Sequence, residues 1–385
     1  MTGMVEGSDI RDEESLKAWL KGQPREVAVW IAFRAAARVL PVWWDAVLTE
    51  DWAHEHDVTA LPVLHALHIS SITAHLLHDA ILGASASKAS AAADFAGETP
   101  EAQPAHAASH AAYAAGQHTN QAAYATFAVV FAARACANAR FAEVWNAVRA
   151  DAGSIICHEF PKFRPLWPEG RGPLAKQWDK IKARVGEGPK PEDWQFWIDS
   201  YGALLNGRPM LGDAARTREM LEKIALIDPA TWDKGPEAVN PVIREIWELH
   251  RLRAEVAGLQ AEKAAFLAAR ASAAQRAHNQ PPGGLVDDAP EVARQITIIW
   301  DGLDEAREEL EQDAPDKGRL RVIAEQMLAA LNAVVAYCGK VADAAVMSAA
   351  KVGGGAVGTA VLDHVALNGR LMQFAKDLLA FGGGG

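Results

Sequence analysis

The side chains best suited to chemistry lie between Leu61 and Leu82, a segment without lysine or arginine. On one predicted helix, His65, His68, His75 and Asp79 fall within an arc of about 80°, so they can approach a common point. Imidazoles with a carboxylate form the ligand sets of zinc or iron. Apolar side chains share the same arc, and we favour packing of neutral histidines in a helix interface. A zinc or iron site and a pH-sensitive interface are the alternatives.

A second chemical candidate is the run Cys157, His158 and Glu159, in which a thiol adjoins a base. Neighbours in sequence rarely share the geometry that nucleophilic catalysis needs, and no third group that would orient the base is evident. The sequence also lacks a phosphate loop, a dinucleotide fingerprint and paired catalytic carboxylates. We therefore assign no catalytic residue and favour a protein without enzymatic activity.

Tryptophans mark the segment from Pro191 to Trp247. Trp194, Trp197 and Tyr201 share one face of a predicted helix. With Arg208 the two tryptophans could line an aromatic recognition pocket. Tryptophans at helical spacing are more typical of a core, because one buried tryptophan removes ~150–250 Å² from water. We favour the core.

Capping residues, prolines and glycines divide this segment into helices. Asp193 is expected to cap the first helix, and Gly207 is expected to end it in a left-handed conformation. A second helix is expected over residues 213–227. A third short helix, antiparallel to its neighbours, is expected to begin near Pro236, and after Pro241 a helix should continue unbroken towards Ala277. The pattern predicts a compact unit of short helices followed by a long connecting helix.

Three parts of this segment resemble a module that recurs in uncharacterised proteins of alphaproteobacteria. They are the D-W-x-x-W-I-x-x-Y run from Asp193, the N-G-R-P turn from Asn206 and the W-x-K-G-P-x-x-V-N run from Trp232. The Q-P-R-E-V-A-V helix from Gln23 and the H-N-Q-P-P linker from His278 often accompany this module. The resemblance touches most of the chain. It implies a bacterial, intracellular protein and no particular activity.

Composition bounds the class of protein. At 385 residues, half of them apolar and with few runs of period two, the chain is expected to be all-α with two or three helical cores. A net charge of −11 gives no basic footprint for nucleic acid. Three isolated cysteines fit a reducing cytoplasm. The acidic start lacks the apolar region of a signal peptide, so we expect a cytoplasmic protein.

Two arginines near the N-terminus could bind an anion. A helix is expected from Pro24 to Leu40, ended by Pro41, with Arg34 and Arg38 on neighbouring turns. An anionic partner is one interpretation of these two charges. We favour pairing within the chain, with the acidic segment that holds Asp45, Glu50 and Asp51.

The alanine-rich sequence that follows has two expected parts. Residues 83–105 have low complexity and predict a loop or a frayed helix. After them the run A-A-Y-A occurs twice, eleven residues apart, at Tyr113 and Tyr124. Eleven residues make three helical turns, so both tyrosines would lie on one side of a single helix. We expect that helix to run from Ala105 to Ala150, with its alanines packed closely against other helices.

Beyond a proline- and glycine-rich linker, heptads predict two antiparallel helical arms. The first arm is markedly acidic. A two-helix hairpin has too small a core to be stable alone, so its seam should pack on the main body, on a second copy or on a protein partner. The residues proposed for that interaction are Ile296, Ile299, Leu303, Met327, Leu331 and Val334.

The C-terminal tail is rich in glycine and then amphipathic. Its apolar face can seal a helical bundle, or it can lie on a membrane. That face consists of Leu367, Leu371, Phe374, Leu378 and Phe381.

Together these patterns predict an all-α multi-helical bundle with a long connecting helix and a C-terminal antiparallel helical hairpin. The expected parts are a helical domain 1–150, a Trp-rich unit with a long helix 151–277, a linker 278–290, a hairpin 291–350 and a tail 351–385. We favour a non-enzymatic scaffold or protein–protein interaction protein of a bacterial cytoplasm. The alternatives are an effector that reaches the membrane through its tail and a helical zinc or iron protein.

Overall fold

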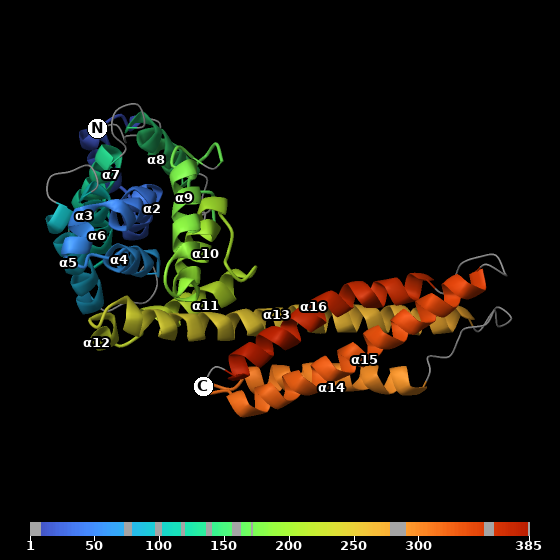
Figure 1. Ribbon diagram of the computed structural model, residues 1–385. Coiled ribbons are helices and arrows are strands. Elements are labelled where there is room, and N and C mark those ends of the chain that lie inside the picture. The colour runs from blue at the N-terminus through green and yellow to red at the C-terminus, as the bar shows by residue number, and fades with distance from the viewer. Residues whose placement is uncertain are drawn as a thin grey trace. The chain divides into compact units, whose positions relative to one another are not determined.

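A computed structural model describes the conformation of most of the chain. The described residues are 9–72, 79–96, 102–116, 120–135, 141–155, 163–170, 172–277, 290–349 and 358–383. Apart from one isolated bridge between Trp167 and Gly170, every regular element within them is a helix (Figure 1). The all-α prediction is therefore confirmed. The chain divides into two compact units, unit 1 (Met1–Ile246) and unit 2 (Trp247–Gly385), and each is described by itself.

Unit 1 is arranged around one central helix. Its helices are α1 (Glu13–Lys21), α2 (Arg25–Thr49), α3 (Asp51–Glu55), α4 (Leu61–Ile72), α5 (Asp79–Ala96), α6 (Gln103–Gly116), α7 (Gln121–Ala135), α8 (Phe141–Ile155), α9 (Ala175–Glu187), α10 (Pro191–Asn206), α11 (Ala214–Ala225), α12 (Pro229–Trp232) and the start of α13 (Pro236–Ala277). Helix α2 packs against α4, α6, α7, α8 and α9. Because α2 is covered on several sides, nearly all of its side chains between Val27 and Val47 are buried.

Helix α2 continues through Pro41, where the sequence predicted its end. A proline inside a helix removes one backbone hydrogen bond and costs about 3 kcal/mol. Trp43 and Trp44, in the next turn, are fully buried, and each buried tryptophan removes ~150–250 Å² from water. This burial outweighs the local cost of the proline. The predicted end at Leu40 is wrong because the prediction used only the local helix propensity of Pro41.

The predicted single helix from Ala105 to Ala150 is also wrong, because the structure has three helices there, α6, α7 and α8. Asn120, just before α7, has a left-handed backbone with φ 69°. Helices α6 and α7 pack against each other, and the rings of Tyr113 and Tyr124 stack with centroids 5.4 Å apart. The two copies of the A-A-Y-A run therefore lie on two neighbouring helices, and their tyrosine rings contact each other. Residues 83–96, expected to be a loop or frayed helix, belong to α5, since alanine has the highest helix propensity.

The helices of the Trp-rich segment begin and end close to the predicted positions. Gly207 ends α10 in a left-handed conformation with φ 61°. The carboxylate of Asp213 accepts a hydrogen bond from the Arg216 amide at 2.8 Å and caps α11. Helix α13 begins at Pro236 and continues to Ala277.

Asp193 does not cap α10 as predicted. It lies in the first turn of that helix, where it is buried and accepts a hydrogen bond at 2.8 Å from the Arg244 guanidinium. The helix starts instead at Pro191, whose fixed φ suits a first helical position.

Unit 2 is a bundle of long helices. It contains the remainder of α13 together with α14 (Pro290–Leu310), α15 (Lys317–Ala349) and α16 (Gly358–Gly383). Helix α15 packs along both α14 and α16 (Figure 1). Apolar side chains from all four helices form one core.

The residues proposed for a partner interface lie inside this core. Ile299, Leu303, Met327, Leu331 and Val334 are buried in it, and Ile296 packs against it partly buried. The described part of the tail's apolar face lies in the same core, through Leu371, Phe374, Leu378 and Phe381. The residues of the predicted seam and the described part of the tail's apolar face therefore belong to one core with the α13 residues of unit 2. The expected linker residues 278–289 lie outside the described part of the chain.

Two helical stretches in the described part are long and apolar enough to cross a membrane by length and composition alone. They are Arg25–Thr49 and Lys317–Tyr337, each with a mean hydropathy of 1.3. In the first, 89% of the apolar window is buried inside unit 1, and in the second the buried share is 39%. A central helix of a globular core meets the same criterion, and α2 is such a helix.

Candidate functional site

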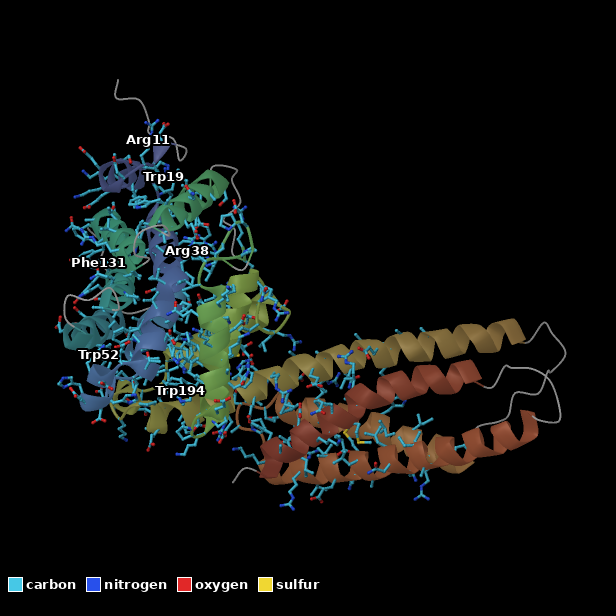
Figure 2. All side chains as sticks on the ribbon, turned by 45° about the horizontal axis from the view of Figure 1, so that its top comes forward. Arg11, Trp19, Arg38, Trp52, Phe131 and Trp194 are labelled. Carbon is cyan, nitrogen blue, oxygen red and sulfur yellow. The ribbon has the colours of Figure 1, made fainter. Side chains whose placement is uncertain are left out.

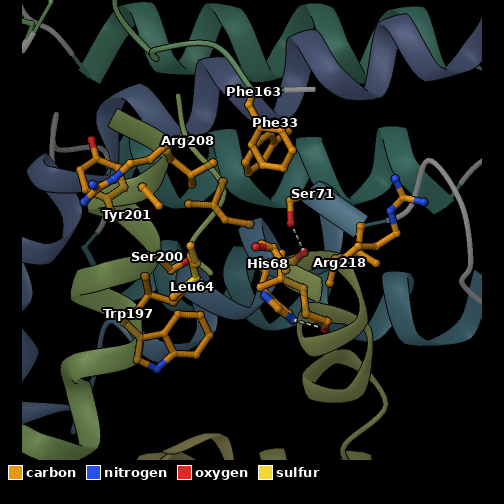
Figure 3. A pocket seen from close by; sticks show the side chains of 18 of the residues that line it. Phe33, Leu64, His68, Ser71, Phe163, Trp197, Ser200, Tyr201, Arg208 and Arg218 are labelled. Carbon is orange, nitrogen blue, oxygen red and sulfur yellow. Dashed lines mark hydrogen bonds between the residues drawn. The ribbon is translucent and has the colours of Figure 1, made fainter. Parts of the chain in front are cut away.

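Unit 1 contains a pocket of about 360 Å³, which we call the unit 1 pocket (Figure 3). Small-molecule sites typically measure ~300–1,000 Å³. Its apolar lining residues are Trp30, Phe33, Ala37, Leu40, Leu64, Leu67, Ile72, Phe163, Trp197, Tyr201, Ala203, Leu204, Met210, Ala214 and Leu221. Its charged and polar lining residues are Glu26, His68, Ser71, Ser200, Arg208, Thr217 and Arg218.

Four helices each present one face to this pocket. On α4 the lining residues begin at Leu64 and recur at intervals of three or four, as far as Ile72. Helix α11 does the same from Ala214 to Leu221, and α2 does so from Glu26 to Leu40. Such spacing places side chains on a single side of a helix. The pocket is therefore a gap between regular helix faces.

Beside this pocket, two arginines and one aspartate form a buried ionic cluster. The Arg34 Nε lies 2.9 Å from the Asp151 carboxylate, and Arg38 donates to the same oxygen (Figure 2 labels Arg38). All three side chains are almost fully buried. Pairing within the chain was expected for both arginines, but the predicted acidic segment was wrong. Asp45 instead pairs with Arg184 at 2.8 Å, because the face of α2 that carries both arginines points into the protein.

The same cluster fixes a stretch of non-helical backbone. Arg34 donates to the carbonyl oxygens of Arg164 at 2.9 Å and Pro165 at 2.6 Å. Arg38 donates to the carbonyl oxygen of Leu166 at 2.8 Å. Charged donors make stronger hydrogen bonds than neutral ones, so three consecutive peptide groups are held against α2.

Phe163, which lines the pocket, directly precedes this fixed stretch. On its other side the stretch lies against Gly207, where a Cβ atom would collide with the backbone of Arg164 and Pro165. Gly207 also has a positive φ, which glycine adopts without strain. Gly207 thus ends α10, and it also allows the backbone of Arg164 and Pro165 to pack closely against the end of that helix.

Three of the donors that line the pocket have acceptors within the protein. His68 Nε2 lies 3.0 Å from the Leu221 carbonyl oxygen, and the Ser71 hydroxyl donates to the His68 carbonyl at 2.7 Å. Trp197 Nε1 donates to Asn240 at 3.0 Å. Burial lowers the pKa of His68 to about 4, so the ring is neutral at pH 7 and carries its single proton on Nε2. Among the described residues that line it, the pocket interior therefore holds no cation.

The charges of the pocket lie on exposed side chains, Arg208, Arg218 and Glu26. Among the described residues neither arginine side chain has a hydrogen bond or an ion pair. Arg208 follows the left-handed Gly207, and its amide donates to the Ala203 carbonyl at 3.1 Å, a bond that closes the end of α10. Figure 3 shows Arg208 extending on the same side of the pocket as Tyr201, while the Arg218 side chain extends away from the pocket on the opposite side.

The predicted histidine stripe is only partly within the described structure. The His65 ring stacks on Trp232 with centroids 3.7 Å apart, and His68 lines the pocket. Burial, with a smaller contribution from His68, lowers the pKa of His65 to about 3. His75 and the side chain of Asp79 lie outside the described residues, as do Cys157, His158 and Glu159. Among the residues that are described, no three potential ligands gather around a point.

The aromatic residues singled out in the sequence separate into two environments. Trp197 and Arg208 both line the pocket, so two of the three residues named for a recognition site lie at the same site. Trp197 is at the same time buried, as expected for a core residue. Trp194 packs against Trp44, with ring centroids 6.1 Å apart, and does not line the pocket.

Sequence reasoning missed the part of the pocket formed by α2, α4 and α11. Each of those helices has an ordinary apolar face, and no residue type distinguishes a face that lines a gap from one that fills a core. Only the N-G-R-P turn could have indicated the pocket from the sequence, because it places a glycine directly before an arginine. In comparisons with protein-family models, curated proteins and solved structures, nothing matches this chain.

Proposed function

We propose that unit 1 binds a small, largely apolar molecule in the unit 1 pocket. The observation that carries the proposal is a gap of about 360 Å³ between four helix faces, with an apolar lining and an interior without charge. Apolar surface removed from water stabilises a complex by ~25 cal/mol per Å² before the costs of association. A molecule that replaces water in this pocket would gain that energy.

Binding is better supported than catalysis because of the state of His68. A general base needs an unprotonated nitrogen near the reacting group and a pKa near the working pH. The pKa of His68 is far below 7, and its ring is oriented by a backbone carbonyl rather than by a carboxylate. The proposal keeps the expectation of a protein that binds rather than catalyses. It moves the binding surface from the hairpin seam to the pocket.

The test uses the full chain and a neutral, environment-sensitive dye such as Nile red. Wild type should bind the dye saturably with one site per chain. Ala214 lines the pocket at the start of α11, whereas its neighbour Ala215 is exposed and does not. We expect Ala214→Trp to weaken dye binding about tenfold or more, by filling the gap, and Ala215→Trp to leave it unchanged.

Melting curves of both variants would show that they remain folded. Absence of saturable binding in wild type, or equal binding by the two folded variants, would refute the proposed function.

A further inference from the structure

The rim and the interior of the unit 1 pocket differ in charge. Arg208, Arg218 and Glu26 are exposed lining residues, so the formal charge of the rim is +2 − 1 = +1. The interior has none, since His68 is neutral and its N–H group already has an acceptor. A ligand that matches both regions has an uncharged, apolar body and one anionic group at its outer end.

Arg208 is the cation best placed for that group. The turn after α10 fixes its backbone through the amide bond to Ala203, and Gly207 is packed against Arg164 and Pro165. A fixed backbone lowers the entropic cost of holding the long side chain at one place. Figure 3 shows Arg208 on the same side of the pocket as the lining residue Tyr201.

Arg218 has the same charge and a similar exposure but a different direction. It is on α11, and in Figure 3 its side chain leads away from the pocket. The two arginines therefore do not form a clamp around one point. Arg218 provides a matched control for the removal of one positive charge at the rim.

We propose that the pocket takes a free monocarboxylic acid with an apolar body, and that the Arg208 guanidinium binds its carboxylate. This inference rests on the proposed function and adds the class of ligand. Guanidinium and carboxylate groups match in geometry and can form two parallel hydrogen bonds. Glu26 opposes the carboxylate through like charge. Apolar side chains, the neutral His68 ring and donors already in use receive the rest of the molecule.

Displacement of the neutral dye by three compounds of equal chain length tests the assignment. The compounds are dodecanoate, dodecanol and dodecylammonium. For wild type at pH 7.5 and low salt, dodecanoate should displace the dye at a concentration about tenfold lower than dodecanol. Dodecylammonium should be the weakest of the three. The advantage of the acid should shrink as salt is raised, because the rim is exposed to solvent.

The variants Arg208→Gln, Arg218→Gln and Glu26→Gln locate the group responsible. Arg208→Gln should remove the preference for dodecanoate over dodecanol, because displacement by dodecanoate then requires a higher concentration. Arg218→Gln should keep most of the preference, and Glu26→Gln should increase it by a factor of about two to three. These three side chains are exposed, so the substitutions leave the core unaltered.

The outcomes separate this inference from the proposed function. If wild type binds the dye and the acid and alcohol displace it equally well, the acid assignment is wrong and the apolar pocket stands. The same holds if Arg218→Gln removes the preference as fully as Arg208→Gln does. If no dye binds to wild type, both proposals are wrong.

Discussion

Unit 1 and unit 2 are both helical, but they bury different kinds of side chain. In unit 1 the buried groups include Arg34, Arg38 and Asp151, together with His65 and His68. The core of unit 2 consists of apolar side chains from four long helices, and in the described part of that unit the buried polar or charged side chains are His250 and Glu309. Charges are costly to bury unless they are paired, so unit 1 depends on specific partners where unit 2 depends on continuous packing.

The helices explain the difference. A heptad repeat carries the same apolar face along a long helix, so α14 and α15 fill the space between them evenly. Unit 1 packs many helices, most of them shorter than its central helix α2, with alanine-rich faces on one side and large rings such as Trp30, Phe33 and Trp197 on the other. Side chains of such unequal size leave gaps, and polar groups hold the irregular backbone around them. A pocket and a buried ionic cluster arise together in this kind of core.

Replacement of Asp151 should cause the largest loss of stability, and that loss should be confined to unit 1. The substitution Asp151→Asn leaves Arg34 and Arg38 buried without a counter-ion and should destabilise unit 1 by ~3–5 kcal/mol. Hydrogen exchange should rise in α2 and α8 and remain unchanged in α14 and α15. The control Asp45→Asn removes an exposed pair with Arg184 and should cost less than about 1 kcal/mol. Equal losses in the two variants would show that the cluster adds nothing beyond a surface pair.

Unit 2 should respond to loss of volume rather than to loss of charge. Leu331 is fully buried, so Leu331→Ala should lower the free energy of unfolding of unit 2 by ~2–5 kcal/mol. Val335, on the exposed side of the same helix, provides the control, and Val335→Ala should stay within about 0.5 kcal/mol. Dye binding by unit 1 should be unchanged in both variants. The opposite result would be a Leu331→Ala protein with unaltered stability but a changed mass in light scattering. That result would support the seam as an interface between molecules.

Acid should weaken unit 1 through its two buried histidines. The pKa values of His65 and His68 are about 3 and about 4 in the folded protein, against an ordinary value of 6.5. The unfolded chain therefore binds more protons below pH 6.5, so this contribution to stability is complete above pH 6.5 and falls as pH drops towards 4. By pH 5 the loss should be about 2 kcal/mol per ring.

Denaturant unfolding at pH 7.5 and pH 5 measures this effect. The double variant His65→Leu, His68→Leu should lose less stability between the two values than wild type does, and it should keep the loss due to His110, whose pKa burial also lowers to about 4. The variant His54→Leu, which changes an exposed histidine, should behave like wild type. If the double variant is as sensitive to acid as wild type, the two rings do not cause the loss.

Gly207→Ala should have a smaller effect on stability, with a local effect on the pocket. A Cβ atom there would strain the left-handed backbone and push against Arg164 and Pro165, at a cost of ~1–3 kcal/mol. Gly212 also has a positive φ but an open surrounding, so Gly212→Ala should cost only about 1 kcal/mol. Dye affinity should fall in the Gly207 variant alone. Equal affinity in both would mean that the wall of the pocket does not depend on this close approach.

Removal of metal should have the smallest effect. The His65 ring is stacked on Trp232, and His68 Nε2 already lies against a carbonyl oxygen. Coordination by both rings would disrupt these contacts. A chelator should therefore leave the melting temperature at pH 7.5 unchanged. A clear drop that added zinc reverses would support the metal site predicted from the stripe.

The sequence predicted the features that depend on neighbouring residues. The stop at Gly207, the start of a helix next to Asp213 and the helix start at Pro236 follow from backbone preferences that act within a few residues. The heptads likewise predicted that residues such as Leu303 and Leu331 share a seam. In these cases local chemistry and the final fold agree.

The sequence could not predict features that depend on distant parts of the chain. Pro41 is tolerated because the surroundings of α2 bury Trp43 and Trp44. Asp151 lies on α8, far from the arginines of α2 in sequence, so charge spacing gave no reason to choose it over Asp45. The pocket likewise needs faces from α2, α4, α10 and α11 at once. Each face alone predicts an ordinary core.

The ionic cluster also sets an order in which unit 1 can be completed during synthesis. Arg34 and Asp151 are 117 residues apart, so a ribosome working at ~5–20 residues per second makes the second roughly 6–23 seconds after the first. Until then α2, an apolar helix, carries two cations without their counter-ion, and these oppose its early collapse into alanine-rich neighbours. The carbonyl groups of Arg164 to Leu166 emerge just after Asp151. The full set of groups that pair with the two cations of the central helix is therefore present only after Leu166 has been made.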